Sequence, residues 1–208
     1  MAGKVDLIKE IPIGGTYFGG NTPDSTSGAH LEGSEVEIEL RNMATNPAPD
    51  YGVHAGGRVR LMAVRNVSGI NLLPGRLVCF KNTSGLYGSQ VDGYPTTTAA
   101  QFAGVVDPFL PSAGVANNDI FWIVIAGPCL VLSALTANED NVFSGGSALV
   151  AITAATSQCT TAGRLVPQLL TGATALLADQ VQNKVGRAMS ACTTAETNTS
   201  KLVYIRGV

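Results

Sequence analysis

Two stretches of the chain carry the same series of three short apolar segments, and every segment contains glycine. The second and third segments recur after 82 and 80 residues, and the first recurs more loosely after 71. Short segments of this kind, separated by Gly, Pro, Asn and Ser, are typical of the strands of a barrel, roll or sandwich. In chain order they are PGRLV at 74–78, QFAGVV at 101–106, WIVIAG at 122–127, GGSALV at 145–150, NKVGRA at 183–188 and LVYIRG at 202–207.

This repeat predicts a mainly β fold: a small barrel, roll or sandwich whose body is a duplicated β unit. The body spans residues 70–208, with copies at about 70–135 and 140–208. Composition agrees, because 24 of the 208 residues are glycines scattered among Thr, Val and Ala, as in short strands joined by tight turns. No long amphipathic helix is expected, and the best helical candidate, residues 174–181, amounts to a turn or two.

Residues 1–33 have no helical periodicity and are predicted to form an extended N-terminal arm. A disordered leader is one interpretation, because residues 21–28 are polar and rich in turn formers. Isoleucine and aromatic side chains are uncommon in solvated disordered tails, however. We therefore expect the arm to bury its apolar side chains on a neighbouring subunit. Its candidate contact residues are Ile11, Ile13, Tyr17 and Phe18.

Residues 34–69 are predicted to form a hairpin-like segment that packs on the body. EVEIEL at 35–40 alternates between acidic and aliphatic residues, and RVRL at 58–61 alternates in the same way with its arginines outward. A surface laced with ion pairs is the simplest interpretation of the acidic residues, since no carbonyl-rich loop supports a cation site.

The two alternating strands are expected to pair, with Glu37 and Glu39 across from Arg58 and Arg60. Such cross-strand ion pairs contribute about 0.2–1 kcal/mol each, so they would set the register more than the stability. This part of the chain also supplies the remaining candidate partner-binding residues, Arg58, Arg60 and Arg65.

The longest apolar run, residues 120–126, falls far short of the roughly 20 residues of a membrane span and predicts a fully buried strand. The N-terminus lacks the apolar stretch of a signal peptide. The four cysteines are widely spaced and form no CxxC motif, which favours free buried thiols over disulfides or metal ligands. These features indicate synthesis in a reducing cytoplasm. The cysteines are Cys79, Cys129, Cys159 and Cys192.

No constellation of side chains in the sequence indicates catalysis, a metal site or a cofactor. The two histidines, His30 and His54, lie in glycine-flanked sequence, and zinc would need further nitrogen or sulfur ligands beside them. A triad of Asp50, His54 and a serine would have no nucleophile elbow or oxyanion-hole motif. Glu139–Asp140 is interpreted as a solvated loop pair. We therefore expect a protein that is not an enzyme and takes no cofactor.

Charge argues against nucleic acid and anionic membranes as partners. The formal net charge is −2. Several cations cluster between Arg58 and Lys81, but few aromatic residues are interleaved with them, as a nucleic-acid-binding strand face would require. Charged residues make up only 13% of the chain, against about 25% in an average protein. Some apolar surface is therefore expected to be covered by a protein partner.

The chain from Asn71 onward, about two-thirds of the sequence, resembles the head decoration, or cement, proteins of tailed bacteriophages. The residues that carry the resemblance are Leu73–Val78, Phe102–Asp107 and Ile123–Pro128, in the order turn, strand and glycine-ended strand. The chain departs from the compact members of that family in its longer N-terminal segment. Such a segment suits an arm that reaches across a subunit junction.

The resemblance implies a virion protein, made in the host cytoplasm, that sits on the outer capsid surface where shell subunits meet. Its partners would be the major capsid protein and further copies of itself, with a homotrimer as the usual assembly. Nucleic acid, membranes and small-molecule substrates are not expected. Three copies around a symmetry axis would each touch several shell subunits, so that many modest contacts act together to stabilise the head.

Two other classes of function stay open. A phage tail, fibre or adhesin module that binds a host glycan would expose aromatic residues in a shallow groove, with Tyr87, Tyr94 and Trp122 as candidates. Trp122 lies in the long apolar run, however, and is expected in the core. A hydrolase with a dispersed site would use His30 and His54.

Overall fold

Strands account for most of the residues that the structure describes. The computed structural model describes residues 16–17, 32–40, 57–81, 88–93, 101–132, 145–146, 148–151, 165–167, 184–189, 191 and 200–206. No helix occurs within these ranges, which confirms the expected mainly β fold; the helical candidate at 174–181 lies outside them. The strands are β1 (Thr16–Tyr17), β2 (Glu35–Leu40), β3 (Gly57–Asn66), β4 (Leu77–Phe80), β5 (Gln90–Gly93), β6 (Gln101–Val106), β7 (Ile120–Leu132), β8 (Ala148–Ala151), β9 (Leu165–Pro167), β10 (Lys184–Ala188) and β11 (Ser200–Ile205).

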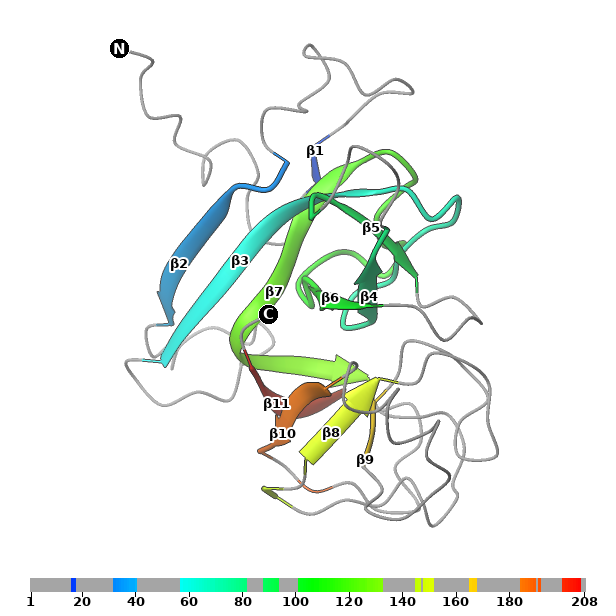
Figure 1. The fold of residues 1–208 in the computed structure, drawn as a ribbon. Helices are drawn as coiled ribbons and strands as arrows, with labels where there is room; N and C mark the ends of the chain where they lie inside the picture. The colour runs from blue at the N-terminus through cyan, green and yellow to red at the C-terminus, as the bar shows by residue number, and fades with distance from the viewer. Residues whose placement is uncertain are drawn as a thin grey trace.

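Five of these strands close into a barrel (Figure 1). Its strand order is β3-β5-β4-β6-β7, and β7 pairs back onto β3 in antiparallel orientation. Strands β3 and β5 run parallel, with Arg65 opposite Gln90 and Asn66 opposite Val91. Closure pairs the backbone groups that an open sheet would leave exposed at its edges. Strand β2 lies outside the ring and pairs with β3.

Strand β7 belongs to both halves of the molecule. Residues 120–126 form the last strand of the barrel, and residues 127–132 pair with β11 in a second sheet, drawn below the barrel in Figure 1. Gly127, at the junction, has a φ of 100°, and a Cβ there would lie 2.3 Å from the backbone carbonyl oxygen of Arg58. Glycine is therefore required where β7 passes from the barrel into the second sheet. Beyond β11 this sheet continues through β10 and β8 to β9.

The second sheet repeats the pairing pattern of the barrel. The barrel contains the order β5-β4-β6-β7, and the second sheet contains β9-β8-β10-β11. Residues at equivalent positions of the sequence repeat meet in the same register. Val105 lies opposite Val124 in the barrel; Arg187, 82 residues after Val105, lies opposite Tyr204, 80 residues after Val124. The sequence repeat thus corresponds to a repeated arrangement of strands.

The second half of β7 holds in the second sheet the position that β3 holds in the barrel. Leu61 of β3 lies opposite Val124, and Pro128 of β7 lies opposite Tyr204, the equivalent of Val124. We call the barrel the first unit and residues 127–132 with β8 to β11 the second unit. Strand β3, although it comes from the segment 34–69, is therefore an integral part of the first unit.

Each unit also contains a β-bulge at the equivalent residue. The pairing of β4 with β6 skips Ala103, and the pairing of β8 with β10 skips Val185. Glycine follows the bulge in both units. A Cβ on Gly104 would lie 2.8 Å from a carbonyl oxygen of β7, and a Cβ on Gly186 would lie 2.0 Å from a carbonyl oxygen of β11. These two glycines of the repeat allow neighbouring backbones to approach closely.

Two apolar clusters form the core, one on each face of the first half of β7. Even-numbered residues from 120 to 124 belong to the first cluster, and odd-numbered residues from 121 to 125 belong to the second. The first cluster also contains Val203 and Ile205, so it joins the two units. Trp122 is 1% exposed, which confirms that the apolar run forms a buried strand and that this tryptophan is a core residue.

Candidate interaction surfaces

Two of the predicted arginines, Arg58 and Arg60, lie exposed on β3 beside the acidic strand β2. The register is the expected one, with Glu37 opposite Arg60 and Glu39 opposite Arg58. The ion pairs run diagonally, from Arg58 Nη1 to Glu37 Oε1 at 3.0 Å and from Arg60 Nη2 to Glu35 Oε2 at 2.5 Å. Exposed pairs of this kind contribute about 0–1 kcal/mol each. A partner that binds these arginines must therefore compete with carboxylates of the same chain.

The third predicted arginine, Arg65, lies in different surroundings. Its side chain is 2% exposed and forms an ion pair with Glu32, whose side chain is 8% exposed. Its Nη1 donates a hydrogen bond of 2.9 Å to the backbone carbonyl of Asn118. The guanidinium is enclosed and bonded within its own chain, so the structure gives no support to the predicted partner contact of Arg65. Its observed role is to tie residue 32 to the barrel.

The N-terminal segment is also attached to the barrel through β1. Thr16 pairs with Phe121 and Tyr17 pairs with Ile120, both on β7 of the same chain. The other predicted arm residues, Ile11, Ile13 and Phe18, lie outside the described residues. Together with the ion pair between Glu32 and Arg65, strand β1 gives the segment two attachment points on the first unit.

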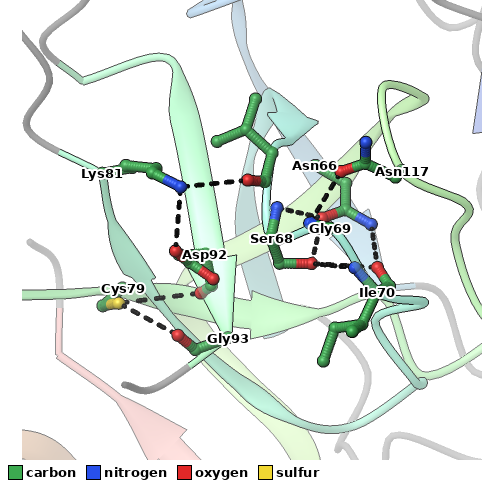
Figure 2. Close-up of polar contacts among 10 residues, drawn as sticks. Asn66, Ser68, Gly69, Ile70, Cys79, Lys81, Asp92, Gly93 and Asn117 are labelled. Atoms are coloured by element: carbon green, nitrogen blue, oxygen red, sulfur yellow. Dashed lines mark hydrogen bonds and ion pairs between the residues drawn. The ribbon is translucent and has the colours of Figure 1, made fainter. Parts of the chain in front are cut away.

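A loop that leaves β3 is held by hydrogen bonds around Asn66, as Figure 2 shows. The Asn66 amide donates to the Ile70 carbonyl at 2.8 Å, and its Oδ1 accepts from the Ser68 N–H at 3.0 Å. The Gly69 N–H donates to Asn117 Oδ1 at 2.8 Å. The loop presents Ile70, which is 63% exposed. A single exposed apolar residue is common on soluble proteins and does not by itself mark a site.

Another exposed surface lies on β10 and β11 of the second unit, two strands that run side by side in Figure 1. Tyr204 and Met189 are 51% and 43% exposed. Arg187 lies directly opposite Tyr204, and the exposed Arg206 follows Tyr204 by two residues, hence on the same side of the extended chain. The half-buried Leu202 precedes Tyr204 by two residues and accepts a backbone hydrogen bond of 2.9 Å from Met189. We call these five residues the β10–β11 face.

The residues expected for a glycan site or a hydrolase site are not brought together among the described residues. His30, His54, Asp50, Tyr87 and Tyr94 lie outside the described ranges. Trp122 is buried and cannot stack against a sugar. Within the described ranges, no group of three or more His, Cys, Asp or Glu side chains could hold a metal ion.

Two of the four cysteines, Cys79 and Cys129, are described, and both are buried free thiols, as expected; Cys159 and Cys192 lie outside the described ranges. Burial raises the pKa of the Cys79 thiol to about 12, and the nearby Asp92 carboxylate adds to the rise. Burial also raises the pKa of the Cys129 thiol, with a smaller contribution from Asp107. Both thiols are therefore protonated at neutral pH and act as small apolar packing groups.

Comparison with known proteins adds no family to this picture. No family model matches the chain, and no curated protein matches it either. In the part of the chain that the structure describes, no helix has the length and apolar character to cross a membrane.

Sequence reasoning missed the β10–β11 face. The signal was present in the alternation of LVYIRG at 202–207, which places Tyr204 and Arg206 on one side of the strand. The equivalent segment of the first copy is apolar on both sides, however. The repeat therefore predicts a glycine-ended strand in both copies and does not distinguish their exposure.

Proposed function

We propose that this protein is a structural component of a bacteriophage head, which binds the outside of the capsid where shell subunits meet and stabilises the shell. The observation that carries the proposal is the attachment of the N-terminal segment to the barrel. Strand β1 pairs with β7, and Glu32 forms a buried ion pair with Arg65. The apolar residues Ile11 and Ile13 therefore precede a point that is fixed on a closed barrel.

An arm that is fixed at one end on its own barrel is well placed to hold neighbouring shell subunits together. Ordering a chain on a partner costs conformational entropy, and a fixed origin lowers that cost. If three copies assemble around an axis, their arms bind neighbouring shell subunits at a high effective concentration, so that weak contacts add up to firm attachment. The small share of charged residues, 13%, also lowers the cost of removing water from the surfaces that meet.

Deletion of residues 1–15 tests the arm. This cut keeps β1 and Glu32, whereas a cut after residue 33 would also remove the Glu32 carboxylate that pairs with the buried Arg65. We expect the shortened protein to keep its melting temperature but to bind heads stripped of the native protein at least tenfold more weakly, because burying one isoleucine contributes about 1.5–3 kcal/mol. Deletion of residues 1–9, which spares both isoleucines, is the matched control. If the protein without residues 1–15 saturates heads as the native protein does, the arm does not contribute to capsid binding.

Purified virions test the proposal as a whole. The chain should be found in them by mass spectrometry, and cryo-electron microscopy should show density on the outer shell that is lost when the gene is deleted. Heads without the protein should release their DNA at a lower temperature. Absence of the chain from virions, or binding of the purified protein to host glycans instead of heads, would refute the capsid function.

A further inference from the structure

We infer that the β10–β11 face docks onto an acidic patch of the capsid shell protein. The inference rests on the proposed function, because the shell supplies the partner. It concerns a surface separate from the N-terminal arm. Leu202 and Tyr204 lie on β11, Arg187 lies on β10, and Arg206 and Met189 directly follow the ends of these two strands.

The first argument compares the same positions in the two units. In the first unit the equivalents of Arg187 and Tyr204 are Val105 and Val124, which pair in the same register and are fully buried. In the second unit the same backbone arrangement leaves Tyr204 half exposed. The arrangement of strands is repeated, but on this face the positions of buried apolar residues hold residues that are exposed to solvent and can also contact a partner.

The second argument is the chemistry of the exchanged residues. Tyrosine, methionine and arginine are among the side chains enriched at protein interfaces, and tyrosine and arginine are among those enriched at binding hot spots. Met189 and Leu202 give the face an apolar end, Tyr204 and Arg187 lie opposite each other at its centre, and Arg206 lies at its other end. An apolar patch bordered by cations matches a partner surface that combines aliphatic side chains with carboxylates.

The third argument is unbalanced charge. In the first unit Arg58, Arg60 and Arg65 each pair with a glutamate, and Lys81 pairs with Asp92 at 3.3 Å (Figure 2). Within the described residues, neither Arg187 nor Arg206 has an acidic partner. The described residues of β8 to β11 include lysine and arginine but no aspartate or glutamate. A partner that brings carboxylates to this face would therefore meet two exposed cations.

An acidic protein surface fits these features better than nucleic acid does. The chain carries a net charge of −2, which opposes long-range attraction to a polyanion. Nucleic-acid interfaces draw most of their affinity from many phosphate contacts, and the face offers two arginines. The exposed apolar side chains of the face, by contrast, can pack against apolar side chains of a protein partner.

The test uses charge reversal at both arginines, Arg187→Glu with Arg206→Glu, in the full-length protein. Affinity for heads stripped of the native protein should fall at least tenfold at low salt, because two attractive pairs become repulsive. Lysine at both positions should restore part of the affinity, and binding of the native protein should weaken as salt rises. Tyr204→Ala should also reduce affinity. Ile70→Ala, which removes an exposed apolar side chain from the first unit, is its matched control, and the melting temperature of every variant checks folding.

The outcomes separate the inference from the proposed function. If the native protein and the charge-reversed protein saturate heads equally well, the β10–β11 face is not the docking surface, although the capsid function stands. If the native protein does not bind heads, both the capsid function and this inference are refuted. Loss on charge reversal of binding to a DNA duplex, without loss of binding to heads, would assign the face to nucleic acid and overturn the inference.

Discussion

At the scale of single residues, two neighbouring polar side chains of β3 determine how the chain approaches β7. Arg65 and Asn66 are both buried, and both bind backbone carbonyls of the loop that precedes β7. The Arg65 guanidinium reaches Asn118, and the Asn66 amide reaches Val115 at 3.0 Å and Ala116 at 3.1 Å. Buried polar groups of this kind fix a single arrangement because an alternative would leave them without partners.

The ion pair of Arg65 gives a prediction at this scale. Glu32→Gln keeps the shape of the side chain but removes the negative charge that pairs with the buried Arg65 guanidinium. We expect a loss of about 3–5 kcal/mol in the free energy of unfolding, measured by urea denaturation. Glu37→Gln, which breaks the exposed pair with Arg58, is the control and should cost less than about 1 kcal/mol. Similar small losses for both variants would show that Glu32 does not neutralise a buried charge.

At the scale of strands, the repeat is defined by bulges and glycines as much as by apolar residues. Ala103 and Val185 bulge out of equivalent strands, and glycine follows each of them. A bulge turns the side chains after it to the other face of the sheet, and the following glycine lets that strand approach its neighbour. The two units therefore share the constraint that bends their sheets, whereas the residues that cover the sheets differ.

These glycines give a second prediction. Gly186→Ala should destabilise the protein more than Gly104→Ala, because the new methyl group would meet a carbonyl oxygen at 2.0 Å instead of 2.8 Å. Overpacking of this kind costs about 1–3 kcal/mol, and Gly186→Ala should reach the upper end. Gly93→Ala is the control, since its Cβ would meet only the Leu72 side chain at 3.6 Å, an ordinary contact. Thermal denaturation of the three variants measures the order, and equal losses for all three would contradict it.

The sequence predicted the elements whose signal is local. The alternation at 35–40 and 58–61 was enough to predict the register of β2 and β3, and the apolar run at 120–126 was enough to predict a buried strand. Barrel closure was not predictable to this detail, because the parallel pairing of β3 with β5 depends on chain reversals that leave no periodic pattern. The burial of Arg65 depends on a glutamate 33 residues earlier in the chain. The exposure of Tyr204 depends on what packs over one face of β11, which the pattern of β11 alone does not determine.

At the scale of the whole molecule, the two units share a strand and a core. Strand β7 contributes residues 120–126 to one unit and residues 127–132 to the other. The first apolar cluster contains Leu61 and Trp122 from the first unit together with Val203 and Ile205 from the second. Removing either unit would expose apolar surface of the other. We therefore expect the two units to unfold together, although their sheets repeat one pattern.

Cooperative unfolding follows from this shared core. The single tryptophan, Trp122, reports on the first unit and on the cluster that joins the two, whereas far-ultraviolet circular dichroism reports on the strands of both. The two signals should change at the same denaturant concentration, as in a two-state transition. Val203→Ala, a cavity in the second unit that costs about 1–3 kcal/mol, should move both midpoints together although it lies on a different strand from the tryptophan. If the variant moves the circular dichroism midpoint and leaves the fluorescence midpoint in place, the two units unfold independently and the cluster does not couple them.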